Sequence, residues 1–387
     1  MVKQAPGQNT SASEIPVFSK KLGTRAWSIT ENMSPELIEK INVTFYELQN
    51  VLRQSKEFVI AYSGGKDSTL LVHLTVAALY SLRKRPKVHI VSVDTQVEIP
   101  TVQEQTAFFL KSIKKWVKQR KLPVKIHVLH PLPQETYWAT LIGRGYVPPN
   151  RMFRWCVSRL KSDPVRHMVQ ALGEETIVLM GMRNTESAER RRSLNKRGIE
   201  GRWTRFTGAN NIKVFLPIVD WTTAEVWEFL LKACPPWGKG YGDLYFLYFD
   251  SFDECTWKPN GGFSCSGNRF GCWTCTVVKK DTAMERLSER NPAMTELLNF
   301  KLWLQDMASR DEKRCAYSRK GKPSKGPFTL SARKEIYDSL KALGKRLNME
   351  FLRDDEEKEI KRIWRKDKRR GFFDIPFTTL VEGTIYE

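Results

Sequence analysis

The segment around residue 63 constrains the fold of this chain more than any other. A short apolar run at residues 58–61 precedes two adjacent glycines, Gly64 and Gly65, and helical apolar periodicity follows at residues 70–74. This order predicts a buried parallel strand, a glycine turn and a helix N-terminus. Glycines let backbone amides approach an anion, and the helix dipole adds partial positive charge there. The sequence therefore predicts that the turn binds a polyphosphate.

The loop residues do not have the spacing of a Walker A loop, which needs Gly, four residues and then Gly-Lys-Ser/Thr. The hexapeptide Ser63-Gly-Gly-Lys-Asp-Ser68 instead resembles the PP-loop of the ATP pyrophosphatases, which split ATP between its α- and β-phosphates. The alternative is an ordinary glycine-containing turn. In such a loop, Lys66 is expected to contact phosphate and Asp67 to hold Mg²⁺. Ser63 and Ser68 are expected to donate hydroxyl hydrogen bonds to the phosphates.

Strands and helices alternate along the chain. Further strands are predicted at residues 88–93, 124–129 and 176–180, and helices at residues 34–55, 67–81, 100–118 and 164–172. This alternation predicts an α/β fold with a doubly wound parallel sheet. The ligand crevice of such a sheet lies beyond the carboxyl ends of its strands. Three informative segments fall at those ends, at residues 63–68, 94–98 and 181–187.

Two of these segments carry residues that could bind a nucleotide. Asp94 directly follows the second strand, where it could contact a sugar or base or simply cap a helix. After the fourth strand, Gly181-Met-Arg183-Asn-Thr-Glu186-Ser resembles the Gly-x-Arg-x-x-Glu-Ser segment of the phosphoadenylylsulfate (PAPS) reductase family. Arg183 is expected to offer a bidentate fork to phosphate, and Glu186 to fix that fork.

The resemblance to that superfamily continues at residues 217–227. Within this segment, Thr222 followed three residues later by Glu225 predicts a capping box at a helix start, with a structural role.

The chain is strongly basic, with 64 Lys and Arg against 43 Asp and Glu and a net charge of +21. Such a surplus favours a polyanionic partner, either nucleic acid or a membrane surface, over a small acidic substrate alone. The alternative to nucleic-acid binding is that the charge serves solubility alone. Residues 183–213 contain nine Lys or Arg and three Glu. This segment could cover bound phosphates as a lid, form a nucleic-acid surface, or be an ordinary run of solvated charges. No apolar run suits a bilayer span or a signal peptide, so we expect a cytoplasmic protein without membrane contact.

The cysteines are spaced as metal ligands. Cys265, Cys272 and Cys275 fall within eleven residues, and Cys255 lies ten positions upstream. A Cys-x-x-Cys pair can give both thiolates to one metal or cluster, so zinc and a [4Fe–4S] cluster both fit, and a redox dithiol is a third alternative. Cys156, before the fourth strand, could approach the same site from the sheet.

The two remaining cysteines, Cys234 and Cys315, have no metal-binding partner nearby in sequence. We expect both to be buried structural thiols.

Four segments, at residues 141–146, 153–156, 160–161 and 269–281, together resemble the DndC family of DNA phosphorothioation sulfurtransferases, which are PAPS-reductase-like proteins. The similarity runs from about residue 55 to 285 and reappears at residues 359–364. It implies an adenine nucleotide alpha hydrolase-like fold and hydrolysis of ATP to AMP and pyrophosphate, which activates a DNA phosphate for sulfur incorporation. The implied partners are DNA, a cysteine desulfurase as sulfur donor and other phosphorothioation-system proteins.

The resemblance also implies roles for particular residues and cofactors. The cofactors are ATP, Mg²⁺ and a [4Fe–4S] cluster. The implied cluster ligands are Cys156, Cys265, Cys272 and Cys275, with Cys255 as a fifth candidate. The implied catalytic residues are Lys66, Asp67, Ser68 and Arg183. The implied nucleotide-binding residues are Ser63, Gly64, Gly65, Lys66, Asp67, Ser68, Asp94, Gly181, Arg183 and Glu186.

Four regions are expected along the chain. They are a flexible arm at 1–33, the PP-loop domain at 34–250, a cysteine-rich cluster segment at 251–285 and a basic helical region at 286–387. The phosphorothioation branch, Dnd on double strands or Ssp on single strands, stays open. Enzymes of the same fold that thiolate tRNA or reduce PAPS or adenylylsulfate are alternatives, as is an iron–sulfur DNA-binding module with an idle nucleotide site.

Overall fold

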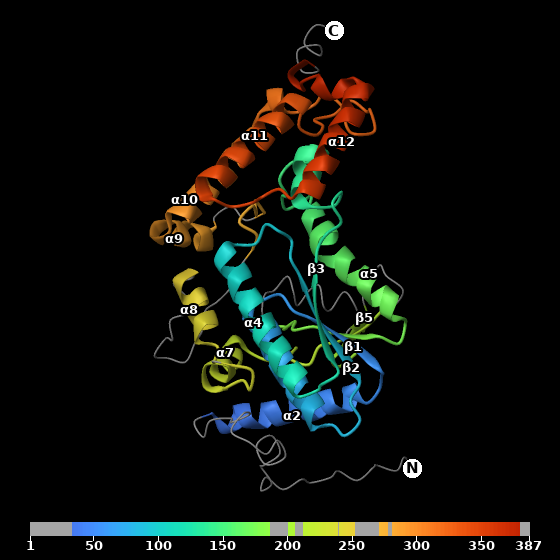
Figure 1. The fold of residues 1–387 in the computed structure, drawn as a ribbon, viewed down its shortest axis with the longest axis vertical. Helices are drawn as coiled ribbons and strands as arrows, with labels where there is room; N and C mark the ends of the chain where they lie inside the picture. The colour runs from blue at the N-terminus through green and yellow to red at the C-terminus, as the bar shows by residue number, and fades with distance from the viewer. Residues whose placement is uncertain are drawn as a thin grey trace, which may run out of the picture.

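A computed structural model describes residues 33–185, 200–205, 212–238, 240–251, 271–277 and 281–379. A twisted sheet occupies the lower half of the molecule in Figure 1, and the C-terminal helices lie above it. Residues 1–32 of the expected arm at 1–33 and most of the basic segment at 183–213 lie outside the described residues. In the described part of the chain, no helix has both the length and the apolar composition needed to cross a membrane.

The sheet is mostly parallel and has the strand order β3-β2-β1-β4-β6-β5. The neighbouring pairs from β3 to β6 are parallel, and only the edge strand β5 runs antiparallel to its neighbour β6. The strands are β1 (Glu57–Ala61), β2 (Lys87–Val93), β3 (Val124–Leu129), β4 (Ile177–Leu179), β5 (Trp203–Arg205) and β6 (Lys213–Phe215). The expected doubly wound α/β sheet is therefore confirmed. Strands β5 and β6 were not expected, because, unlike the equally short but wholly apolar β4, each includes a charged residue, Arg205 in β5 and Lys213 in β6.

Helices cover both faces of the sheet because alternate strand residues point to opposite sides. In β1, Phe58 and Ile60 join the largest apolar core, whereas Val59 faces a smaller core that includes Val169 of the opposite helix layer. The helices of this part are α2 (Pro35–Leu52), α3 (Lys66–Ser81), α4 (Pro100–Gln119), α5 (Asp163–Leu172), α7 (Thr223–Lys232) and α8 (Gly242–Ser251). The predicted capping box is confirmed at α7, where Thr222 and Glu225 each accept the other's backbone N–H.

A second core joins the middle of the chain to the C-terminal helices. In the middle of the chain, two π-helical segments contribute residues to this core, η2 (Ala139–Gly143) and η3 (Val157–Ser162). The C-terminal elements are α9 (Thr282–Arg290), α10 (Pro292–Ser309), η5 (Asp311–Lys313), α11 (Leu330–Leu347), α12 (Asp354–Arg370) and η6 (Phe372–Asp374). The expected helical C-terminal region is therefore present.

A buried ion network ties α11 to α12. The Asp367 carboxylate accepts hydrogen bonds from Arg333 at 2.6 Å and from Arg319 at 2.8 Å. Because Arg333 and Asp367 are almost fully buried, removing one partner would leave the other as a buried charge without an opposite charge. The network therefore fixes how these two helices pack.

Candidate nucleotide and thiol site

The loop after β1 lies where the strand order reverses. β2 pairs on one side of β1 and β4 on the other, so the loops that leave β1 and β4 start side by side. In open α/β sheets, ligands bind in the crevice at this switch point. The predicted segments at residues 63–68 and 181–183 therefore lie next to each other.

The backbone of this loop requires its glycines. Gly64 has a φ of +76°, in the left-handed region that residues with a side chain rarely adopt. Gly65 is the N-cap of α3 and offers no side-chain oxygen to the first helical turn. The first amides of a helix have no intrahelical acceptor, so this turn presents N–H donors and the positive end of the helix dipole. An anion is the ligand that such a turn favours.

The two loop serines brace the turn from inside. The Ser68 hydroxyl donates to the carbonyl oxygen of Gly65 at 2.9 Å and accepts from the backbone N–H of Ser63 at 3.2 Å. The Ser63 and Ser68 hydroxyls also lie 3.2 Å apart. The only proton of the Ser68 hydroxyl is thus used within the loop. The expected donation from Ser68 to phosphate is not the arrangement found here, and Ser68 holds the shape of the loop instead.

Close packing brings the end of β4 against the start of α3. A Cβ atom on Gly181 would lie 2.9 Å from the carbonyl oxygen of Asp67 and 3.2 Å from the amide nitrogen of Ser68. Real side chains do not approach backbone so closely. Only glycine permits this contact, and the expected nucleotide contact of Gly181 stays a prediction.

Arg183 anchors Asp67. Its guanidinium Nε donates to the Asp67 carboxylate at 2.7 Å, and its other nitrogens donate to Thr185, the Trp221 carbonyl and Thr223 at 3.0–3.1 Å. The residue is only 1% exposed. The guanidinium is occupied by protein acceptors, so the expected bidentate fork to phosphate is not the arrangement found here and stays a prediction.

Asp67 faces two cations. Its second carboxylate oxygen lies 3.3 Å from the Lys66 ammonium, while the first accepts from Arg183. With both oxygens facing cations, the carboxylate does not fit the expected role of an open Mg²⁺ ligand. Mg²⁺ in enzymes is commonly held largely through substrate phosphates and water. Asp67 is better described as the group that positions Lys66.

Lys66 is buried but remains charged. Burial alone lowers the pKa of its ammonium group, but the Asp67 carboxylate and then Tyr248 raise it, so that the pKa lies above its ordinary value. The ammonium lies 5.3 Å from the centre of the Tyr248 ring, and the Tyr248 hydroxyl accepts from the Lys66 backbone N–H at 3.4 Å. A fixed positive charge thus lies at the N-terminus of α3, where it is suited to binding a phosphate.

Tyr248 was not identified from the sequence. It lies in α8, about 180 residues beyond the loop. No motif marks it, and only the packing of α8 brings its ring to Lys66.

The loop after β2 lies beside the glycine loop, because β1 and β2 are paired. One carboxylate oxygen of Asp94 accepts from the Gln96 backbone N–H at 2.8 Å, and the other accepts from the Gln103 side chain at 3.3 Å. These bonds hold the loop before α4 against its first turn, but the N-cap of α4 is Ile99, so Asp94 does not cap this helix. The side chain keeps partial exposure beside the crevice, so a nucleotide contact stays a prediction.

The same loop leads from the nucleotide side to the cysteines. Glu98 forms an isolated antiparallel bridge with Cys272, and the Trp273 N–H donates to the Val97 carbonyl at 2.9 Å. Thr95 donates its hydroxyl to Glu98 at 2.5 Å, and its oxygen lies 3.7 Å from the Cys272 sulfur. The Cys272-x-x-Cys275 segment is therefore attached directly to the carboxyl end of the sheet.

Cys156, Cys272 and Cys275 share one electrostatic neighbourhood. Burial raises the pKa of the Cys272 thiol to about 11, while the nearby Lys161 ammonium opposes that rise. Burial and then Cys275 raise the pKa of Cys156. Tyr137 belongs to the core cluster against which Cys156 and Cys272 pack, and it donates to the Thr274 carbonyl at 3.4 Å. Lys161 belongs to a segment singled out in the sequence, whereas Tyr137 carried no signal there.

This neighbourhood has the donor chemistry of a thiolate-bound cluster. Thiolates are the ligands of [4Fe–4S] clusters, and Lys161 supplies a positive charge that favours thiolate over thiol. Among the described residues, no three Cys, His, Asp or Glu side chains are close enough to hold a single metal ion. Cys265, Cys255 and Glu186 lie outside the described residues.

The remaining cysteines differ from each other. Cys315 is fully buried and donates its thiol to the Phe373 carbonyl at 3.1 Å, as expected for a structural thiol. Cys234 is exposed, so the expectation that it is buried is wrong. It follows the last turn of α7, which ends at the surface.

With this geometry in place, one comparison decides the family. The profile of the phosphoadenosine phosphosulfate reductase domain matches residues 57–278, more than half of the chain. The chain belongs to this family. The match covers the glycine loop, Gly181, Arg183 and the Cys272-x-x-Cys275 pair, and it confirms the expected PAPS reductase-like domain.

Individual proteins are more distant. An uncharacterized protein of Methanocaldococcus jannaschii is 26% identical over 242 residues, which cover 62% of this chain and 40% of that protein. This chain thus aligns with less than half of that relative.

Two solved structures are also similar. The U34-tRNA thiolase NcsA of Methanococcus maripaludis, with its [4Fe-4S] cluster, has 13% identity and a TM-score of 0.36 over 70% of this chain and 80% of that chain. The FMN adenylyltransferase of Candida glabrata in complex with ATP has 16% identity and a TM-score of 0.36 over 55% of this chain and 60% of that chain.

Proposed function

We propose that this protein splits ATP into AMP and pyrophosphate and uses the adenylate to activate a DNA backbone phosphate for sulfur incorporation. The observation that carries the first half is the loop at residues 63–68. It combines a left-handed glycine, the N-terminus of α3 and the buried, charged Lys66. Such a site stabilises the negative charge that develops on a leaving pyrophosphate.

The loop residues divide the work. Lys66 and the α3 amides bind and orient the phosphates, Asp67 and Arg183 hold Lys66 in place, and Ser68 keeps the turn in shape. Positioning and charge neutralisation provide most of the catalysis in phosphoryl and related transfers. An acceptor phosphate oxygen then attacks the α-phosphorus, pyrophosphate leaves, and AMP becomes the group that sulfur displaces.

The second half of the proposal is supported by the thiols. Cys272 is joined to the β2 loop, which lies beside the glycine loop, so thiols and nucleotide share one edge of the sheet. A [4Fe–4S] cluster held by Cys156, Cys265, Cys272 and Cys275 would supply an iron site able to carry sulfur or electrons. A cysteine desulfurase is the proposed sulfur donor.

DNA is proposed as the acceptor on two grounds. One is the resemblance of residues 153–156 and 269–281 to the DNA sulfurtransferases, and the other is the net charge of +21. A phosphate backbone is the polyanion that so large a surplus favours. The charge also distinguishes the protein from enzymes that act on a small sulfonucleotide alone.

The deciding experiment resolves AMP from ADP after incubation of the purified protein with ATP. Without DNA, water takes the place of the acceptor phosphate oxygen, and we expect AMP and pyrophosphate. Lys66→Ala removes the phosphate-facing charge and should lower turnover by roughly 2–4 kcal/mol of transition-state stabilisation. Lys111→Ala, on the exposed face of α4, is the matched control and should leave turnover unchanged. ADP as the product, or equal turnover in both variants, contradicts the assignment.

A further inference from the structure

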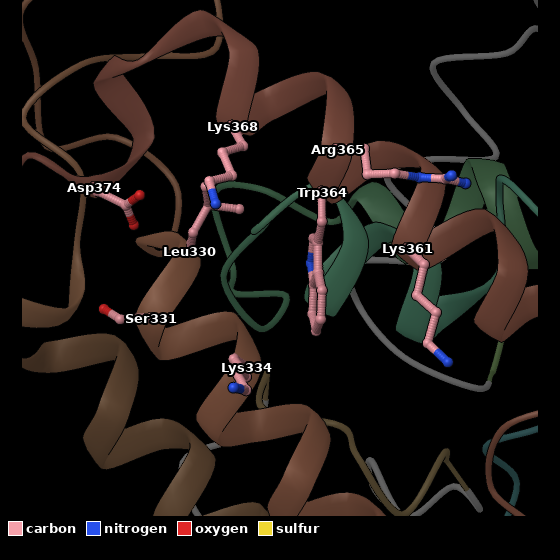
Figure 2. Close-up of a pocket in the computed structure, with 8 residues that line it drawn as sticks. All are labelled: Leu330, Ser331, Lys334, Lys361, Trp364, Arg365, Lys368 and Asp374. Carbon is pink, nitrogen blue, oxygen red and sulfur yellow. The ribbon is translucent and has the colours of Figure 1, made fainter.

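The C-terminal helices enclose a hollow far from the glycine loop in sequence. It lies between the first turn of α11 and the second half of α12 and has a volume of about 730 Å³. Figure 2 shows the Trp364 side chain projecting into it from α12, with Lys361 and Arg365 on one side and Lys334 on the other. We name this hollow the α11–α12 groove.

The groove is positively charged. Four cations line it, Lys334, Lys361, Arg365 and Lys368, against a single carboxylate, that of Asp374. All four are exposed to solvent. Lys361 pairs with a glutamate one turn away, whereas no carboxylate in the described chain lies within ion-pair distance of the other three cations. The N-terminus of the 18-residue helix α11 opens into the same hollow and adds partial positive charge.

Trp364 is held as a fixed platform within this charge. Its indole N–H donates to the Ile142 carbonyl at 2.9 Å, and the ring packs at 76° to the Tyr337 ring, with 5.6 Å between centres. The indole is therefore positioned before any ligand arrives. A base stacks on such a ring while lysines and arginines alongside contact the flanking phosphates.

We propose that the α11–α12 groove binds single-stranded DNA, with one base stacked on Trp364. The choice of DNA rests on the proposed function, and the choice of a single strand rests on the geometry. In a duplex the bases are paired and stacked, so only phosphates reach a basic surface. An indole inside a hollow is open only to a base that has left the stack.

The groove is also linked to the thiol site through η2. The Ile142 carbonyl that fixes Trp364 belongs to the buried segment 137–142, and Tyr137 of that segment lies in the core cluster against which Cys156 and Cys272 pack. The residue on which a base would stack is thus fixed by the same buried segment whose core cluster packs against Cys156 and Cys272. This arrangement suits a surface that delivers its substrate to the sulfur chemistry.

Binding is measured by fluorescence anisotropy with a labelled oligothymidylate and with an abasic strand of equal length. We expect the wild-type protein to bind oligothymidylate roughly tenfold more tightly than the abasic strand. Trp364→Ala should erase this difference, and Trp364→Phe should restore part of it. A purely structural role of Trp364 would weaken both strands equally.

The charges are tested with a variant in which Lys334, Arg365 and Lys368 are all changed to Gln. Affinity for oligothymidylate should fall about tenfold or more, and the slope of log affinity against log salt should flatten by about two units. The control changes three exposed α4 lysines to Gln, alters the net charge equally and should retain wild-type binding. These residues are Lys111, Lys115 and Lys118.

Three results would overturn the proposal. They are equal loss in the groove and control variants, binding to duplex DNA as tight as to the single strand, or clearly tighter binding to single-stranded RNA. Release of AMP without DNA should be unchanged in the groove variant. If the wild-type protein makes no AMP, the proposed function fails, while the binding measurements still decide the groove.

Discussion

At the scale of single residues, the structure gives Arg183 a different role from the one that the sequence predicts. A phosphate-binding arginine would be exposed in the crevice, whereas Arg183 is buried and holds Asp67. Arg183→Ala should therefore lower the free energy of unfolding by about 3 kcal/mol, since it strands a carboxylate and several acceptors. Urea denaturation measures this change.

The pair gives a second readout. In a double-mutant cycle, Asp67→Ala combined with Arg183→Ala should cost less than the sum of the single changes, because the two side chains share one interaction. Additive effects, or a raised KM for ATP with unchanged stability, would show that Arg183 contacts phosphate after all.

The role of a site residue could be predicted from the sequence where its interactions are local, and not where its partners are distant along the chain. Gly64, Gly65 and Lys66 could be assigned because their roles follow from a local turn and helix start. The partners of Arg183 could not, because Trp221 and Thr223 lie about 40 residues away. Tyr248 carried no local signal at all.

At the scale of elements, the contact between β4 and α3 determines the shape of the crevice. Gly181→Ala places a Cβ atom against the Asp67 backbone, which cannot move without shifting the helix start. We expect a loss of stability of about 1–3 kcal/mol and a higher KM for ATP. Gly242→Ala is the control, because a Cβ atom at that exposed position meets nothing within 4 Å. An unchanged KM in Gly181→Ala would mean that the crevice relaxes freely.

The helix α12 carries a titratable contact with Thr136, which lies three residues before η2. Glu356 is 1% exposed and accepts a hydrogen bond from Thr136, and burial raises the pKa of its carboxyl group to about 7. A carboxyl whose folded pKa exceeds its unfolded value stabilises the fold at low pH. That contribution falls as pH rises from about 4.3, the ordinary glutamate value, to about 7.

Glu356→Gln should therefore become more stable relative to the wild-type protein by about 2–3 kcal/mol between pH 4 and pH 8. Urea denaturation at several pH values measures this. Asp374→Asn, at an exposed position, serves as the control. A difference between Glu356→Gln and wild type that does not change with pH would contradict the raised pKa.

The elements of the sheet were predictable where they are long and periodic. The bounds of β3 match the expected residues 124–129, and α4 differs from its expected range by one residue. The π-helical turns η2 and η3 were not predicted, because their widened turns reflect tertiary packing around Trp138 and Leu160 rather than local sequence preference. The C-terminal region could be predicted to be helical, but the position of its helices against the rest of the fold could not.

At the scale of the whole molecule, the thiols connect parts of the chain that are remote in sequence. Cys156 precedes η3, while Cys272 forms the bridge to Glu98 and Cys275 follows it three residues later. A cluster bound by these residues would therefore tie the middle of the chain to the C-terminal half. Its removal should lower the stability of the second core more than that of the sheet, because thiolate ligands are contributed mainly from the former.

We expect anaerobically purified protein to be brown and to hold about four irons per chain. Cys272→Ser should abolish both colour and iron, because the segment loses a ligand at its sheet attachment. Cys234→Ser is the matched control, since that thiol is exposed and follows α7, and it should keep both. Chelation of the iron should then lower the midpoint of thermal unfolding in the wild-type protein and in Cys234→Ser but not in Cys272→Ser. Stoichiometric zinc in an iron-replete preparation, or full iron retention in Cys272→Ser, would replace the cluster with a structural zinc site or move it to other cysteines.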